Sequence, residues 1–95
     1  GAHGNYFTMY SHFQLSPFKQ LWLADFLSNS SDTLLLVKIG EAIFREKQKL
    51  GAFDDLEEAG YFFNQGQFRL NENFHFVQEG LEFHYNIYEI QPYAL

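Results

Sequence analysis

The fold is decided near the C-terminus by the stretch Phe74-His75-Phe76-Val77-Gln78-Glu79-Gly80-Leu81-Glu82-Phe83-His84-Tyr85. Apolar residues alternate with polar ones on both sides of a short segment that contains a glycine. Alternation with a period of two is typical of strands with one buried face, and a short glycine-containing segment between two such strands is typical of a hairpin. We therefore expect an antiparallel β-hairpin over residues 73–85.

The shared face of the two strands predicts the register of this hairpin. Both strands bury their aromatic residues together when the loop has an even length, which favours a two-residue Glu79-Gly80 turn. The cross-strand pairs expected in this register are Phe76 with Phe83 and Phe74 with Tyr85 on the aromatic face, and His75 with His84 on the other face.

A long amphipathic helix is predicted before the hairpin, from the polar run at residues 28–32 to Leu50. Ser30, Ser31 or Asp32 is suited to cap its first turn, because each side chain can accept a hydrogen bond from a free N–H group. Gly51 is suited to the left-handed position that closes the helix. Its apolar stripe comprises Leu35 or Leu36, Ile39, Ile43 and Leu50, widened by Val37 and Phe44.

Shorter patterns complete the expected architecture. Residues 5–15 alternate like a half-buried strand, and Ser16-Pro17 predicts a turn after it. Residues 21–27 fit either a strand or a single helical turn, whereas Asp54 to Ala59 predicts a short second helix. This order predicts one α+β domain over residues 1–95, with an antiparallel sheet packed against one long helix.

The composition predicts a folded domain with an aromatic core. Twelve Phe, six Tyr and one Trp among 95 residues supply large apolar side chains, which disordered chains lack. The absence of cysteine excludes disulfides and thiolate metal sites. The longest unbroken apolar runs, such as Leu34 to Val37, are far shorter than the roughly 20 residues that span a bilayer.

Charge is distributed unevenly along the chain. Residues 51–95 carry eight acids and one base, Arg69, a sum of −7, whereas residues 1–50 sum to +1. Such an acidic half repels phosphate backbones, which argues against a nucleic-acid partner. It can steer a cationic partner, or it can simply form a solvated acidic face that aids solubility.

The sequence contains no convincing catalytic or cofactor-binding motif. His75 and His84, with His12, are weak metal candidates, because imidazole binds zinc but no third ligand is set by the spacing. The alternative is that two exposed histidines simply meet across the strands. No phosphate-binding loop and no nucleophile elbow occur. We expect a protein that is not an enzyme and carries no cofactor.

Two stretches resemble a known family. Residues 74–94 resemble its signature F-x-F/L-x-x-x-G-L-x-F-x-F/Y-x-x-Y-E-I-A-P-Y-A, with Gln91 where the family often has Ala. Gly1-Ala2-His3-Gly4-Asn5 resembles its opening, G-G-A-H-x-N. This is a domain of unknown function in bacterial envelope proteins, found in RsiV-type anti-sigma factors that sense lysozyme, beside PdaC-type peptidoglycan deacetylase domains, and in lipoproteins.

The resemblance implies an extracytoplasmic location, periplasmic or at the cell surface, and a binding or sensing role without catalysis. It also implies that the chain is a piece of a larger, membrane-anchored envelope protein. The binding candidates are the motif residues His3, Tyr88, Glu89, Pro92 and Tyr93, together with the neighbouring Tyr85. Tyrosines combine contact area with a polar tip, so these residues either contact a ligand or close the end of the core.

Three functional hypotheses follow. The first is a binding or sensing domain whose partner is a cationic, lysozyme-like protein. The second is a peptidoglycan- or glycan-binding module that is accessory to a cell-wall enzyme. The third, a hydrolase fragment, has the least support. An unpaired sheet edge would also allow a homo-oligomer.

Overall fold

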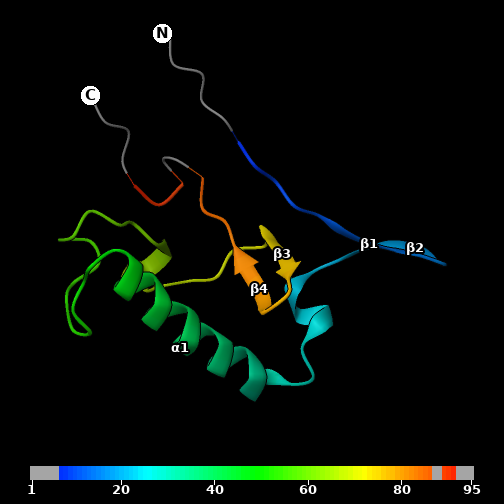
Figure 1. Cartoon of the computed structure of the whole chain (residues 1–95), viewed down its shortest axis with the longest axis horizontal. Helices are drawn as coiled ribbons and strands as arrows, with labels where there is room; N and C mark the ends of the chain where they lie inside the picture. Colours follow the sequence, from blue (N-terminus) through cyan, green and yellow to red (C-terminus); the bar gives the residue numbers. More distant parts are fainter. Residues whose placement is uncertain (1–6, 87–88, 92–95) are drawn as a thin grey trace, which may run out of the picture.

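The computed structural model describes residues 7–86 and 89–91, and Figure 1 shows their arrangement around one long helix. These residues form two separate two-stranded antiparallel sheets, so the predicted α+β class is confirmed. The elements in chain order are β1 (His12–Leu15), β2 (Phe18–Leu21), the 3₁₀ turn η1 (Leu23–Phe26), α1 (Ser30–Lys47), the 3₁₀ turn η2 (Asn64–Gly66), β3 (Phe74–Val77) and β4 (Gly80–Phe83).

The first hairpin, β1–β2, is shorter than the strand predicted over residues 5–15. Its ladder begins at His12, and Ser16-Pro17 forms the turn between Leu15 and Phe18, as expected. Residues 7–11 pair with no strand in the described part of the chain. A side chain binds the backbone of this segment instead: Asn73 Oδ1 accepts a hydrogen bond from Tyr10 N at 2.7 Å. The ambiguous stretch over residues 21–27 contains the end of β2 and then η1.

Helix α1 begins inside the predicted capping run and ends at Lys47, three residues before the predicted limit at Leu50. Asn29, rather than Ser30, Ser31 or Asp32, is the N-cap, and its Oδ1 accepts from Asp32 N at 3.0 Å. The left-handed residue after the helix is Lys49, with φ of 59°, and not Gly51. Residues 28–32 include several side chains that can cap a helix. Which of them is the N-cap depends on where the backbone turns into the helix.

The predicted short second helix over residues 54–59 is a series of hydrogen-bonded turns. Ala59 N donates to Asp55 O at 3.1 Å and Tyr61 N to Leu56 O at 2.8 Å, and Gly60 then takes a φ of +97°. Arg45 of α1 holds the start of this loop, because its Nη1 donates to the carbonyls of Gly51 and Asp54 at 2.8 Å each. The segment therefore packs through turns and not as a helix.

The second hairpin forms as predicted but in a register shifted by two residues. Phe74 pairs with Phe83, and Phe76 pairs with Leu81, around a Gln78-Glu79 loop. The predicted pairs Phe76 with Phe83 and Phe74 with Tyr85 are therefore wrong. Gly80 takes a positive φ, 144°, which a residue without Cβ adopts without strain. A shift of two keeps the same side chains on one face.

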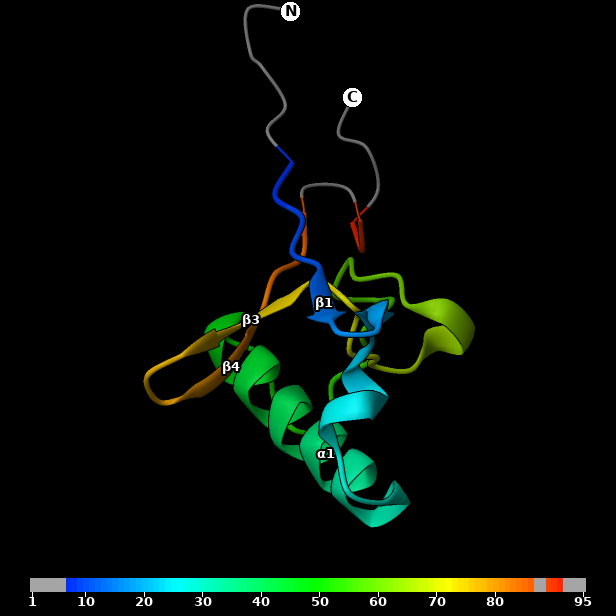
Figure 2. The same ribbon diagram turned by 90° about the vertical axis from the view of Figure 1, so that its right-hand side faces the viewer.

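The core lies between α1 and the loop that follows it. Leu56, Phe63 and Phe68 form the buried cluster, and Phe44 of α1 packs against it. Figure 2 shows β3–β4 lying alongside α1, with β4 on the side of the helix. The hairpin therefore flanks α1, while the main packing contact of α1 is with the buried cluster. Within the described residues, no helix is long and apolar enough to cross a membrane.

Candidate functional site

A groove of about 700 Å³ separates α1 from the β3–β4 hairpin. One wall is the helix, the other is the hairpin, and the cluster of aromatic side chains forms the floor. Its main apolar lining residues are Leu36, Ile39, Ile43, Phe68, Leu81 and Phe83. A cavity of this size with mainly apolar walls is typical of ligand-binding sites.

The helix wall exposes side chains that the sequence pattern assigned to the core. Ile39 and Ile43 are each 48% exposed, and Leu35 of the same stripe is 57% exposed. Val37 and Phe44, one step around the helix, pack against the buried cluster instead. Residues three and four apart lie on one helix face, so both faces show the same apolar periodicity. The stripe is therefore divided between core and groove.

The floor of the groove requires a close approach that Gly40 permits. A Cβ at this position would lie 3.0 Å from Leu70 Cδ2 and 3.5 Å from Phe68 Cε2. The contact with Leu70 is tighter than ordinary packing and that with Phe68 is an ordinary one, so the missing side chain lets α1 lie close to Leu70. Gly40 thus sets the distance between the helix and the floor.

Tyr85 closes one end of the groove and is the predicted binding residue that the structure places there. Its ring packs edge-on against Phe44 and Phe63, and its hydroxyl donates to the carbonyl oxygen of Arg69. Burial, helped by the negative charge of Glu89, raises the pKa of Tyr85 to about 12. Tyr85 therefore holds the fold while one side lines the groove.

Glu89 is exposed and holds the backbone beside the hairpin. Its Oε1 accepts from Asn86 N at 3.0 Å, and its Oε2 accepts from Asn71 Nδ2 at 3.0 Å. Both carboxylate oxygens are thus engaged inside the protein. The other predicted motif residues, His3, Tyr88, Pro92 and Tyr93, lie outside the described residues.

The predicted histidine pair is wrong, because the register shift separates the two rings. His75 faces Glu82, with Nε2 2.9 Å from Glu82 Oε1, while His84 Nε2 lies 3.1 Å from Asn86 Oδ1. The hydrogen bond from His75 holds the pKa of Glu82 below its usual range. Among residues 7–86 and 89–91, no three His, Asp or Glu side chains gather in a way that could hold a metal ion.

Sequence reasoning missed the two buried asparagines that organise the β3 side of the molecule. Asn73 and Asn86 are 5% and 8% exposed. Asn86 Oδ1 accepts from Thr8 N at 2.8 Å, and Asn73 Nδ2 donates to Thr8 O at 2.6 Å. Buried amides need such partners. The alternation of polar and apolar residues does not reveal that they are buried, because both lie just outside the hairpin strands.

A second cavity, of about 370 Å³, lies between the β1–β2 hairpin and residues 71–73. Trp22, 49% exposed, and Tyr10 give it an aromatic lining. Some of its polar groups are bound internally, since Glu72 Oε1 accepts from Leu23 N at 2.7 Å. The second cavity is thus about half the volume of the groove.

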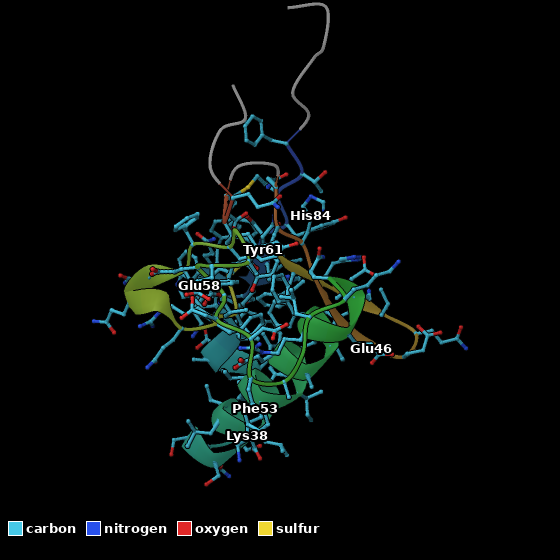
Figure 3. The ribbon with its side chains drawn as sticks, turned by 90° about the vertical axis from the view of Figure 1, so that its left-hand side faces the viewer. Lys38, Glu46, Phe53, Glu58, Tyr61 and His84 are labelled. Atoms are coloured by element: carbon cyan, nitrogen blue, oxygen red, sulfur yellow. The ribbon has the colours of Figure 1, made fainter. Side chains whose placement is uncertain are left out.

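Acidic side chains are spread over the surface. Figure 3 shows Glu46 and Glu58 at opposite sides of the view, while Tyr61 lies near the centre. Two exposed carboxylates, Glu79 and Glu82, line the groove, and Lys47 of α1 lines it too. The rim of the groove on the hairpin side is therefore acidic.

Comparison with known proteins assigns the chain to a family. No curated protein and no solved structure is similar enough to count as a match. The family described as a protein of unknown function (DUF3298) matches residues 24–95, which include α1, both walls of the groove and the tyrosine-rich motif. The opening motif at residues 1–5 and the β1–β2 hairpin lie before the matched region. The chain belongs to the DUF3298 family.

Proposed function

We propose that this domain is a non-catalytic ligand-binding or sensing domain of an extracytoplasmic protein of the bacterial envelope, and that the groove between α1 and β4 is its site. The observation that carries the proposal is the apolar helix wall. Ile39 and Ile43 remain half exposed and line a groove of about 700 Å³. Exposed apolar surface with a polar rim is typical of interaction sites.

Charge favours a cationic protein as the ligand. Residues 51–95 sum to −7, and Glu79 and Glu82 stand at the groove itself. A negative field of this kind speeds the encounter with a positively charged partner and weakens as salt screens it. The resemblance to RsiV-type and PdaC-type envelope domains supports the extracytoplasmic location and a lysozyme-like protein as that partner.

A binding role agrees with the ionisable groups at and beside the groove. His75 and Glu82 are close enough for proton exchange, but their side chains are 28% and 60% exposed on a two-stranded hairpin. General acid–base catalysis needs such a pair to be held against a bound substrate with water largely excluded. The groove walls offer apolar contact instead.

Calorimetric titration against lysozyme at low and high salt tests the proposal. We expect binding at low salt that weakens at high salt, and loss of binding in the double variant Ile39→Ser/Ile43→Ser. Leu34→Ser is the matched control, because Leu34 lies on the same helix, is 68% exposed and does not line the groove. The absence of binding at low salt would reject a lysozyme-like partner.

A glycan ligand is the alternative, and the second cavity favours it. Sugar rings stack on exposed aromatic side chains beside polar groups, and Trp22 and Tyr10 meet Gln20 and Glu72 there. Pull-down on purified peptidoglycan compares Trp22→Ala with Phe53→Ala, since Phe53 is fully exposed elsewhere. If peptidoglycan retains Trp22→Ala as well as it retains the wild type, this cavity is not the glycan site. Tyr88→Ala and Tyr93→Ala test the tyrosine-rich motif in the same assay.

A further inference from the structure

The two outer edges of the β3–β4 sheet differ in what contacts them. On the β3 side, His12 Nε2 donates to the carbonyl oxygen of Phe74 at 2.8 Å. Asn73, just before β3, binds Thr8 and Tyr10 of the extended N-terminal segment. A side chain thus binds one outward backbone group of β3, the Phe74 carbonyl, and the N-terminal segment lies beside the start of this strand.

The outer edge of β4 carries backbone groups that point away from β3. His84 N donates to Asn73 O at 2.8 Å, so that pair is hydrogen-bonded. Hydrogen-bonded and non-hydrogen-bonded pairs alternate in an antiparallel ladder. The N–H and C=O groups of Leu81 and Phe83 therefore face outward. Within the described residues, no backbone or side-chain partner is found for them.

This open edge borders the groove. Leu81 and Phe83 line it on the hairpin side, and Ile39 and Ile43 face them from α1. Figure 2 shows β4 as the strand nearer the helix. An extended chain entering the groove would meet a row of backbone donors and acceptors on one side and apolar helix side chains on the other. These are the two features of strand-addition sites.

A second copy of the chain is a poor occupant of this edge. If two β4 strands paired antiparallel so that each Leu81 bonded the Phe83 of the other, the two Glu82 side chains would lie directly opposite one another. The Cβ atoms of directly opposed residues are about 5 Å apart, and like charges on two such residues destabilise the strand pair. Each copy also carries a net charge of −6. A strand with a basic residue opposite Glu82 fits instead.

We infer that the groove receives an extended segment of a partner protein, which adds to β4 as a third strand and has an apolar–basic–apolar pattern. The apolar residues lie opposite Leu81 and Phe83, and the basic residue lies opposite Glu82 on the other face of the sheet. This inference rests on the proposed function of the groove and specifies how a cationic partner is recognised.

Peptide binding followed by amide hydrogen exchange tests the inference. The probe is the blocked peptide Ser-Thr-Val-Arg-Val-Thr-Ser, with Glu in place of Arg as the control. We expect the Arg peptide to bind roughly tenfold more tightly, and the amides of Leu81 and Phe83 to gain protection on binding. The amide of Glu82, already in the ladder, is the internal reference. No binding, equal binding of the two peptides, or binding without that protection would overturn the inference.

Substitution of the edge itself gives a second test. Leu81→Pro deletes an outward N–H, which edge strands tolerate, whereas Leu81→Ala removes the same side chain and keeps the N–H. We expect the Pro variant to bind the peptide roughly tenfold more weakly than the Ala variant, as for one lost hydrogen bond. Equal affinities would contradict strand addition. If the Pro variant does not fold, N-methylation of the peptide's central residues removes its donors and is expected to weaken binding equally.

The lysozyme titration separates the two proposals. Binding that is lost in Ile39→Ser/Ile43→Ser but unchanged in Leu81→Pro would overturn strand addition and leave the groove as the site. Peptide binding with edge protection, together with no lysozyme binding, would support strand addition and reject the lysozyme-like partner.

Discussion

Helix α1 has two apolar sides with different surroundings. On one side, Phe44 meets the rings of Tyr61, Phe63, Phe68 and Tyr85, with centroids 5.1–6.4 Å apart. On the other side, the isoleucines are about half exposed to the groove. The same residue classes with the same spacing thus serve a core and an open surface. The difference shows that helical periodicity identifies apolar faces but does not say which of them the fold covers.

The packed side of the helix is expected to carry most of its stability. Replacing Phe44 by Ala removes a ring that bridges four others. Truncating a fully buried Phe to Ala costs about 3–5 kcal/mol of stability. Because Phe44 is only partly buried, we expect Phe44→Ala to cost about 3 kcal/mol. Urea unfolding measures this as a lower midpoint. Small domains hold about 5–15 kcal/mol in all, so the loss is large. A change under about 1 kcal/mol would mean that this cluster is not the core.

The boundary between the two sides is set by the contact at Gly40. Gly40→Val is expected to destabilise the domain by about 1–3 kcal/mol, because its side chain would press on Leu70 and Phe68. Gly40→Ala is the control. It gains about 1 kcal/mol of helix propensity and needs Leu70 to move only slightly, so its stability should stay near that of the wild type. A stabilised Val variant would show that α1 does not pack this closely on the floor.

Titration of the Tyr85 hydroxyl tests how deeply this ring is buried beside Phe44 and Phe63. Its folded pKa, about 12, lies above the ordinary 10.0, so the neutral form is favoured by folding. This contribution is present in full below pH 10 and is lost as the pH rises from 10 to about 12. We expect the free energy of unfolding to fall over that window, and to fall less in Tyr85→Phe. Chemical denaturation at several alkaline pH values, with tyrosinate absorbance, measures both. An identical slope in Tyr85→Phe would argue against a buried hydroxyl.

Local patterns predicted the two main elements of this fold but not the short second helix, which forms turns instead, or the length of the first strand. The helix and the second hairpin follow from periods of 3.6 and two residues in their own sequence. The hairpin register does not, because a shift by two residues leaves Phe74 and Phe83 on the same face. The prediction of a histidine pair depended on that register and failed with it.

The candidate site was less predictable than the fold. The sequence points to Tyr85 and Glu89 through a motif, and both lie at or beside the described hairpin, but each is engaged in internal hydrogen bonds. Ile39 and Ile43 were assigned to the core, because nothing in a helical stripe says where residues 56–70 will pack. Those residues cover only the Phe44 side. The groove is thus a consequence of tertiary packing.

The groove side of α1 should contribute little to stability, which gives the smallest expected effect. Ile43→Ala removes a side chain that is already 48% exposed, so it forfeits only part of the roughly 2–3 kcal/mol of a fully buried isoleucine. Alanine also has a higher helix propensity than isoleucine. We expect a net loss of under about 1 kcal/mol in urea unfolding, well below that of Phe44→Ala, and clear weakening of ligand binding. Equal losses of stability in the two variants would place Ile43 in the core and remove the apolar wall on which the binding proposal depends.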